Sequence, residues 1–444
     1  MGFTLKKHQV YGSSMMDALP ALGLFYDMGT GKTATTLDWL YRAVGRGEVS
    51  QALVVCPATM TGTWERAVDK MYQFDGYTPE GIEAVRACLT ITSFQRTYKR
   101  VDKEVRHKNG KVSTKRRYVV REEIDHDWDA IIVDESHCIG AHDSVQTKTM
   151  LALAPSAKHR YILTGTPVTG GGGGCDYKKM YGQINFLEPG FFRTWTDFKQ
   201  RCVLSCDPWG NPRKYREDVC EDILKSHGIV ARLVECVDMP ERTDTFIPCE
   251  IAEKTIYNDI VKGKWTKYGF DVTVAGGQNT KLLQICSGHL KTPDGTRRYR
   301  TSKIQTVLDL LNGTDGKVVI FALYLESLAM LSEAIPDAVV FRGGSGETWR
   351  EMQEGDKRVA IIQYNAGSSS LDLYASHTMI FYEPTLSALL LDQACGRIFR
   401  TGQRNACTYY YLYTPGTVEE KTMRTVYSGV DVTREMLDQW AHEI

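Results

Sequence analysis

Short apolar runs recur along the chain and alternate with segments that have the spacing of amphipathic helices. In the first part of the chain the runs are Gln51–Cys56, Ala130–Val133 and Arg160–Leu163. Runs that are apolar at nearly every position are typical of parallel strands buried on both faces of a sheet. The pattern resumes later at four segments: Lys317–Leu323, Ala338–Phe341, Val359–Gln363 and Thr378–Tyr382. The sequence therefore predicts two α/β lobes, each built on a parallel sheet.

Length and composition fit two such lobes. The chain has 444 residues, too many for one ordinary core, and its 42% apolar and 24% charged residues are typical of a globular protein. No apolar run approaches the ~20 residues needed to cross a bilayer, and Met1–Lys7 lacks a signal-peptide pattern. We therefore predict a cytoplasmic protein with no membrane contact. The 54 basic and 54 acidic residues cancel, so nucleic acid would have to be held by local basic patches.

A glycine-rich loop stands between an apolar segment, Ala21–Tyr26, and a helical one, Ala34–Tyr41. Its glycines allow backbone N–H groups to approach phosphate oxygens, and the N-terminus of the following helix favours the anion. We predict that Lys32 reaches the β- and γ-phosphates of a nucleotide and that Thr33 coordinates magnesium. The strict phosphate-loop pattern has glycine where Tyr26 stands, so the match is to the helicase variant. The predicted phosphate-binding residues are Met28, Gly29, Thr30, Gly31, Lys32 and Thr33.

Two carboxylates, Asp134 and Glu135, follow directly after the apolar run Ala130–Val133. The carboxyl ends of parallel strands meet at the edge of a sheet where ligands bind in such folds. With a phosphate loop upstream, we predict that Asp134 holds magnesium and that Glu135 polarises the attacking water as general base. The alternative is a solvated pair of acids at a strand end.

Two further clusters leave alternatives open. The basic insert Arg96–Arg121 has Asn109-Gly110 at its centre, a strong signal for a β-hairpin. It is either an electrostatic grip on DNA or a solvated surface insertion. Cys202, Cys206, Cys220 and His227 could ligate zinc, but their spacing matches no common zinc module, so we favour separate thiols.

The order of motifs along about Leu5–Lys421 resembles helicase superfamily two, specifically its Swi/Snf-type DNA translocases. The segments that carry the resemblance, besides the phosphate loop, are Leu5–Gln9, Val55–Pro57 with Trp64-Glu65, Ile91–Phe94, Asp134–His137, Leu163–Val168, Val318–Phe321, Asn365–Leu373 and Gln393–Gln403. The resemblance implies two RecA-like lobes and ATP hydrolysis with magnesium. It also implies that Gln9 contacts the adenine base.

Arg397 and Arg400 lie three residues apart, and we predict that they share one face of a helix. Beside Gln393, and in line with the family resemblance, they are predicted to be arginine fingers that stabilise charge on the transferred phosphoryl group. Asp372 replaces the usual asparagine of its motif and could accept a hydrogen bond from a ribose hydroxyl. The predicted contacts to nucleic acid, or relays of lobe closure, are Thr92, Ser93, Thr164, Thr166, Asn365 and Ser368.

We expect lobe 1 at residues 1–175, a mostly helical insertion spanning the lobe boundary at 176–300, lobe 2 at 301–425 and a tail or brace at 426–444. The predicted function is an ATP-driven motor that tracks along duplex or branched DNA. The compact chain suits a phage or bacterial factor in replication, recombination or repair, with proteins of those processes as partners and no required oligomer. Two alternatives stay open: a strand-separating helicase acting on branched DNA or RNA, and a nucleotide-dependent clamp that does not hydrolyse ATP.

Overall fold

The computed structural model describes residues 4–106, 112–171, 174–270, 278–343, 348–367 and 371–429. The chain divides into two compact units: Met1–Thr169 with Gly174–Asp238, called lobe 1 here, and Gly170–Gly173 with Met239–Ile444, called lobe 2. The segment 176–300, expected to span the lobe boundary, is split after Asp238 between the two units.

Lobe 1 is built on a six-stranded parallel sheet in the order β12-β1-β7-β6-β2-β3. The strands are β1 (Ala21–Tyr26), β2 (Ala52–Cys56), β3 (Leu89–Ser93), β6 (Trp128–Asp134), β7 (Ala157–Leu163) and β12 (Gly228–Ala231). Successive residues of β2 enter different cores, with Leu53 and Val55 on one face and Val54 and Cys56 on the other. The predicted buried parallel sheet is therefore confirmed.

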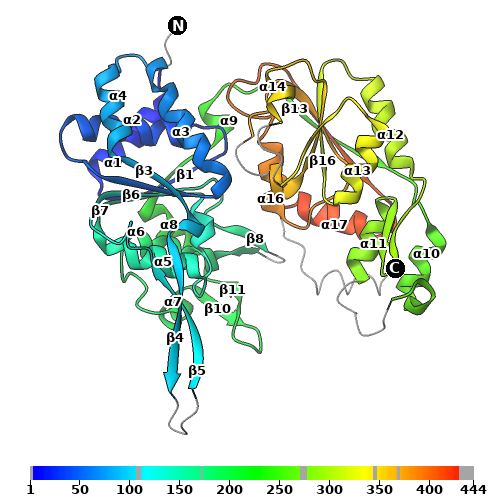
Figure 1. The fold of residues 1–444 in the computed structure, drawn as a ribbon, viewed down its shortest axis with the longest axis horizontal. Coiled ribbons are helices and arrows are strands. Elements are labelled where there is room, and N and C mark those ends of the chain that lie inside the picture. The colour runs from blue at the N-terminus through cyan, green and yellow to red at the C-terminus, as the bar shows by residue number, and fades with distance from the viewer. Residues whose placement is uncertain are drawn as a thin grey trace. The chain divides into compact units, whose positions relative to one another are not determined.

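Helices cover both faces of this sheet (Figure 1). One face carries α1 (Lys7–Ala18), α2 (Lys32–Gly45), α3 (Thr61–Asp69) and α4 (Pro79–Cys88). The other carries α5 (Val145–Leu153), α6 (Met180–Leu187), α7 (Trp195–Cys202) and α8 (Glu217–His227). The short α9 (Leu233–Cys236) follows β12.

The basic insert forms the predicted hairpin. β4 (Tyr98–Arg106) pairs antiparallel with β5 (Val112–Val120), from Tyr98 opposite Val120 to Arg106 opposite Val112. The Asn109-Gly110 turn lies outside the described residues. The two strands extend beyond the rest of lobe 1 (Figure 1). A second hairpin in the lobe pairs β10 (Val203–Cys206) with β11 (Pro212–Tyr215), and β8 (Thr169–Gly171) and β9 (Gly174–Asp176) are short strands.

Lobe 2 has a second six-stranded parallel sheet in the order β13-β20-β19-β16-β18-β17. The strands are β13 (Arg242–Pro248), β16 (Lys317–Ala322), β17 (Val339–Phe341), β18 (Val359–Gln363), β19 (Ser376–Phe381) and β20 (Cys407–Tyr413). All four apolar runs predicted for this part of the chain are strands, so the second α/β lobe is confirmed.

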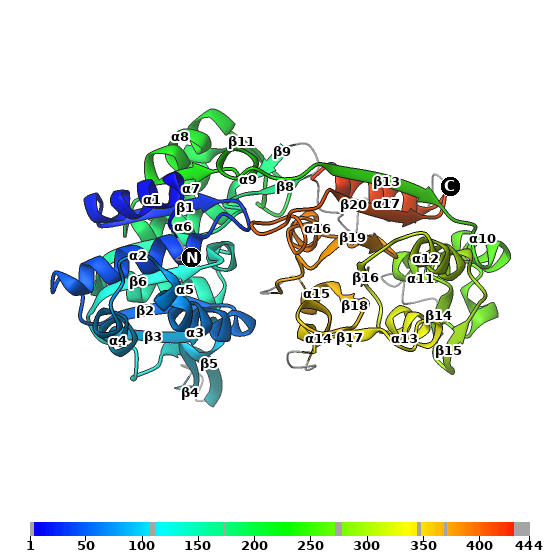
Figure 2. The same ribbon diagram turned by 90° about the horizontal axis from the view of Figure 1, so that it is seen from above.

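The helices of lobe 2 also cover both faces of its sheet (Figure 2). One face packs against α12 (Ser302–Asn312) and α13 (Leu325–Ala334), and the other against α14 (Arg350–Gln353), α15 (Tyr364–Gly367) and α16 (Ala388–Cys395). A smaller core joins α10 (Lys254–Val261) and α11 (Gln278–Cys286) to β14 (His289–Thr292) and α17 (Val418–Tyr427), and β15 (Gly295–Arg298) pairs with β14. None of the helices in the described ranges is long and apolar enough to span a membrane.

Candidate nucleotide-binding site

Three of the predicted loops lie side by side at one edge of the lobe 1 sheet. The phosphate loop follows β1, the Asp134–Glu135 pair ends β6, and Thr164 follows β7. Because β7 lies between β1 and β6 and all three strands are parallel, their carboxyl ends bring these loops to adjacent positions.

The phosphate loop has the backbone conformation that its glycines permit. Gly29 and Gly31 have φ values of 78° and 89°, in the left-handed region that other residues rarely adopt. A Cβ atom on Gly31 would lie 2.1 Å from Nε2 of Gln9, so no side chain fits there. The Lys32 ammonium donates to the carbonyl oxygen of Tyr26 at 2.8 Å. Lys32 also begins the 14-residue helix α2, whose first N–H groups point toward the loop.

Gln9 is buried against this loop and connects it to α1. Its Nε2 donates to the carbonyl oxygen of Thr30 at 3.0 Å, and its Oε1 accepts from the backbone N–H of Lys6 at 2.8 Å. Both ends of the amide therefore bind backbone groups of lobe 1. The structure gives Gln9 a role in shaping the phosphate loop, and its contact with a nucleotide base stays a prediction.

The Asp134 carboxylate is buried and held in place from two sides. Its Oδ2 accepts from Nε1 of Trp64 at 2.8 Å, and its Oδ1 accepts from the backbone N–H of Glu135 at 2.9 Å. Burial, followed by the charge of Glu135, raises the pKa of Asp134 to about 6, whereas the charge of Lys32 and the Trp64 hydrogen bond act in the opposite direction. The influence of Lys32 on this carboxylate means that the phosphate loop and the acidic pair form one electrostatic site.

Glu135 is the only described residue other than glycine with a positive φ, 51°. Such a conformation is uncommon for glutamate and persists only where the surroundings fix it. Nδ1 of His137 lies 3.3 Å from Oε2 of Glu135 and 3.4 Å from Oγ1 of Thr164. Burial alone would lower the pKa of His137, but hydrogen bonds with Cys138 and Glu135 raise it to about 9. His137 thus joins the loops that follow β6 and β7.

The loop after β7 closes the site on the side of the phosphate loop. Thr164 is fully buried, and its hydroxyl oxygen accepts from the backbone N–H of Thr166 at 3.1 Å. A Cβ on Gly165 would lie 3.3 Å from the Tyr26 carbonyl oxygen, so this loop runs directly beside the phosphate loop. Buried and internally bonded, Thr164 suits the relay role predicted for it better than a surface contact.

The donor set at this edge fits a magnesium ion. Thr33 lies half-buried in the first turn of α2, and Asp134 offers a carboxylate. The two hydrogen bonds to Asp134 use two of its roughly four lone-pair positions. Hydroxyl and carboxylate oxygens are ligands that magnesium prefers, so Thr33 and Asp134 are the residues that would hold it.

In lobe 2 the two predicted arginine fingers approach one carbonyl group. Nη1 of Arg397 and Nη1 of Arg400 donate to the carbonyl oxygen of Leu371 at 3.4 and 3.3 Å. Our prediction that they share a helix face is wrong, because α16 ends at Cys395 and both arginines lie in the turns that follow. They meet because the chain folds back on Leu371. Asp372 forms an ion pair with Arg400.

Gln393 lies in α16, and Arg397 donates from Nε to its carbonyl oxygen at 3.0 Å. The side chain of Gln393 is largely buried, at 8% exposure. The structure thus brings Gln393, both arginines and Asp372 together within lobe 2.

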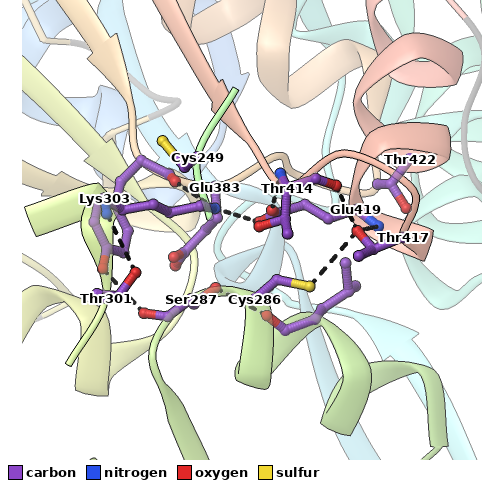
Figure 3. Close-up of polar contacts among 12 residues, drawn as sticks. Cys249, Cys286, Ser287, Thr301, Lys303, Glu383, Thr414, Thr417, Glu419 and Thr422 are labelled. Carbon is purple, nitrogen blue, oxygen red and sulfur yellow. Dashed lines mark hydrogen bonds and ion pairs between the residues drawn. The ribbon is translucent and has the colours of Figure 1, made fainter. Parts of the chain in front are cut away.

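Lobe 2 also contains a buried polar network (Figure 3). Nζ of Lys303 lies 2.5 Å from Oε1 of Glu419, and both side chains are 0% exposed. Burial alone would lower the pKa of Lys303, but Glu419 keeps it above its ordinary value. Glu383 accepts from the backbone N–H groups of Leu323 and Tyr324 at 2.8 and 3.0 Å. Lys303 and Glu419 thus neutralise each other inside the lobe, Glu383 is held by neutral donors, and no sequence motif pointed to them.

The remaining predicted contacts differ in their exposure. Thr92 is half-buried and Ser93 buried at the end of β3, whereas Asn365 is exposed on α15. Ser368 lies outside the described residues.

No group of three potential metal ligands occurs in the described part of the chain. The His227 ring contacts the Ile223 carbonyl and Glu188.

The sheet order, the phosphate loop and the Asp-Glu pair at one strand edge define lobe 1 as a P-loop lobe of the helicase type, joined in one chain to a second RecA-like lobe. The model of the SNF2-related domain matches residues 18–283. This match covers more than half of the chain, which therefore belongs to the SNF2-related domain family.

Two curated relatives illustrate the similarity. The DNA repair and recombination protein RDH54 of Saccharomyces cerevisiae is 23% identical over 474 residues, covering 90% of this chain and 49% of that protein. The ISWI chromatin-remodeling complex ATPase CHR11 of Arabidopsis thaliana is 22% identical over 460 residues, covering 93% and 40%. The chain thus spans half or less of the length of these relatives. The SWI2/SNF2 ATPase core of Sulfolobus solfataricus, solved in complex with double-stranded DNA, is 18% identical with a TM-score of 0.42, covering 98% of this chain and 92% of that one.

Proposed function

We propose that this protein is a DNA-dependent ATPase that uses ATP hydrolysis to move along duplex DNA. The observation that carries the proposal is the arrangement at the edge of the lobe 1 sheet. There the phosphate loop, the Asp134–Glu135 pair and the loop of Thr164 lie on three adjacent strands. The family supports the same activity, and the similarity to RDH54, a DNA repair and recombination protein by name, supports a role in one of those processes.

In the proposed reaction, the backbone N–H groups of the phosphate loop and the Lys32 ammonium bind the β- and γ-phosphates of ATP. Magnesium, held by Thr33 and Asp134, would neutralise phosphate charge. Glu135 orients a water molecule whose oxygen attacks the γ-phosphorus, and its carboxylate accepts the proton. The bond from the γ-phosphorus to the bridging oxygen breaks, which gives ADP and inorganic phosphate.

Lobe 2 is proposed to supply Arg397 and Arg400 to the charge that develops on the transferred phosphoryl group. Because the arginines belong to the other lobe, hydrolysis would require the lobes to close around ATP and would let them reopen afterwards. Alternating closure and opening, with a grip on DNA in each lobe, gives directed stepping. Thr92, Thr166, Asn365 and Ser368 remain the proposed backbone contacts, with the buried Ser93 and Thr164 as relays.

The β4–β5 hairpin is proposed as an additional grip on the phosphate backbone. Arg100 is neutralised by Asp102, with two contacts of 3.0 Å, and Lys99 by Glu122 at 2.6 Å. Arg116 and Arg117 are exposed and have no acidic partner among the described residues. Two uncompensated arginines on a protruding hairpin favour DNA contact over the alternative of a solvated insertion.

The test is the ATPase rate of the purified chain with duplex DNA, single-stranded DNA, forked DNA and RNA. We expect duplex DNA to stimulate turnover most, and Glu135→Gln to abolish the stimulated rate while nucleotide still binds. Preference for forks or RNA, together with strand separation, would favour the helicase alternative. Turnover that survives in Glu135→Gln would contradict the assignment of the base.

A further inference from the structure

Behind the candidate site, a fully buried glutamine joins two of its loops. Gln183 lies in the largely apolar helix α6 and is 0% exposed. Its Oε1 accepts from the Ser136 hydroxyl at 2.8 Å, and its Nε2 donates to the carbonyl oxygens of Pro167 and Lys179 at 2.7 and 3.2 Å. The amide thus connects the loop of Glu135, the loop of Thr164 and its own helix.

The orientation of this amide follows from its partners. A carbonyl oxygen can only accept a hydrogen bond, so the nitrogen of Gln183 must face Pro167 and Lys179. The amide oxygen then faces Ser136, whose hydroxyl must be the donor. Each polar atom of the amide has a partner, which a buried glutamine requires. A side chain at position 183 must therefore offer both a hydrogen-bond donor and an acceptor to keep these contacts.

The link acts on the backbone next to the proposed general base. Ser136 directly follows Glu135, whose φ of 51° needs support from its surroundings. Helix α6 is also packed tightly against this loop, because a Cβ on Gly182 would lie 1.8 Å from the Ile139 carbonyl oxygen. Gln183 therefore fixes the segment after Glu135 from the side of the core, away from the phosphate loop.

A second connection between the same two loops runs through His137, which approaches both Glu135 and Thr164. The loops after β6 and β7 are thus connected twice: once at the site by His137 and once in the core by the Gln183 amide. Removing the core tie leaves the phosphate loop and the His137 connection in place but frees the backbone that carries Glu135.

We propose that Gln183 is a positioning residue, which holds Glu135 in its left-handed conformation and couples it to the Thr164–Pro167 loop. This inference rests on the proposed ATPase function. It predicts that Gln183 acts on the chemical step and not on nucleotide binding, because its hydrogen bonds go to Ser136, Pro167 and Lys179 and not to Lys32 or the phosphate loop. A small displacement of a catalytic group lowers turnover by up to about a hundredfold.

The test compares Gln183→Leu, Ser136→Ala and the double variant in DNA-stimulated ATPase assays, with Asn185→Ala as control. Asn185 lies on the same helix and binds the backbone of Phe192, remote from both loops, so its loss weakens α6 packing alone. We expect Gln183→Leu to lower kcat about tenfold or more with KM for ATP within about twofold of the wild type. The double variant should be no slower than the slower single variant, because both changes break the same link.

Wild-type kcat in Gln183→Leu, or an equal loss of kcat in Asn185→Ala at an equal fall in Tm, would overturn the positioning role. If Gln183→Leu does not fold, Ser136→Ala reports on the same link without changing α6, and unchanged turnover in that variant would also overturn it. An inactive wild-type protein would instead contradict the proposed function.

Discussion

Each lobe is built on its own six-stranded parallel sheet, but the charged groups at the carboxyl edges of the two sheets are arranged differently. In lobe 1 the charged groups Lys32, Asp134 and Glu135 are gathered on adjacent loops, and burial together with Glu135 raises the pKa of Asp134 to about 6. In lobe 2 the buried charges Lys303 and Glu419 neutralise each other, at 0% exposure.

This difference separates two tasks. Like charges held together at a strand edge are unfavourable for the empty lobe and favourable once a cation and a phosphate arrive, as expected of a catalytic edge. A closed ion pair gives no binding energy to a ligand but fixes α12 and α17 to each other. In the proposed function, lobe 1 is therefore the site of chemistry and lobe 2 the support from which Arg397 and Arg400 act.

The largest effect is expected from Glu135→Gln, which removes the general base and keeps the size of the side chain. Turnover should fall by about 10²–10⁴-fold at saturating ATP and DNA, while the nucleotide still binds to Lys32 and the phosphate loop. Glu80→Gln, an exposed acid on α4, serves as the control and should keep the wild-type rate. Equal rates in Glu135→Gln and Glu80→Gln would contradict the assignment of ATP hydrolysis to the lobe 1 site.

Glu419→Gln tests the buried Lys303–Glu419 ion pair of lobe 2. It leaves the Lys303 charge buried without its counter-ion, and the unfolding free energy of lobe 2 should fall by about 3–5 kcal/mol. The neighbouring Glu420→Gln is a matched control, because Glu420 pairs with the exposed Arg424 and such pairs contribute at most about 1 kcal/mol. Denaturant unfolding of the wild type, Glu419→Gln and Glu420→Gln measures the loss of unfolding free energy at each position. Equal effects at the two positions would refute a buried structural pair.

A pH-dependent loss of stability is expected from His289 in lobe 2. Its Nδ1 is buried without a partner among the described residues, and burial lowers the pKa of His289 to about 4. The unfolded chain, with an ordinary pKa near 6.5, binds the proton more tightly. Stability should therefore fall as pH drops from about 6.5 to about 4, by up to about 3 kcal/mol in total.

The substitution His289→Leu tests whether this imidazole causes the loss of stability at low pH. In His289→Leu the part of the acid destabilisation due to this group should disappear, whereas exposed His126→Leu should follow the wild-type curve. Unfolding free energies measured between pH 4 and 7.5 decide the matter. A wild-type pH dependence in His289→Leu would exclude this group as the cause.

The smallest effect is expected from the β4–β5 hairpin. Replacing Arg116 and Arg117 by alanine should leave kcat at low salt nearly unchanged. It should also reduce the slope of log affinity against log salt by about 2, because each arginine would neutralise about one phosphate. Arg213 and Lys214, on the other hairpin of lobe 1, are the control pair. An unchanged slope would favour the alternative of a solvated insertion.

Much of the fold was predictable because the central strands are buried on both faces and read as apolar runs, as in β2, β6, β16 and β18. Two of the strands at sheet edges, β12 and β13, gave weaker signals. β12 leaves Val230 64% exposed, and β13 begins with the polar residues Arg242–Thr245, so neither has a continuous apolar pattern.

The site was predictable where function fixes local sequence, as in the phosphate loop and the Asp134–Glu135 pair. Contacts between residues that are distant in the sequence could not be predicted. Trp64 binds Asp134 across 70 residues, and Gln183 binds Ser136 across 47, with no local pattern to join them. The only local signal for the second contact was the presence of a polar Gln183 in the largely apolar α6. The three-residue spacing of Arg397 and Arg400 fitted a helix, but it equally fits the turns in which they lie.

The central claim is that hydrolysis at the lobe 1 edge requires the arginines of lobe 2. It is tested most directly by the single-turnover rate of ATP hydrolysis in Arg397→Ala and Arg400→Ala, with duplex DNA saturating and exposed Arg404→Ala as control. We predict that both variants bind ATP with nearly wild-type affinity and hydrolyse it at least about a hundredfold more slowly, whereas Arg404→Ala keeps the wild-type rate. Wild-type hydrolysis in folded Arg397→Ala and Arg400→Ala would contradict the claim.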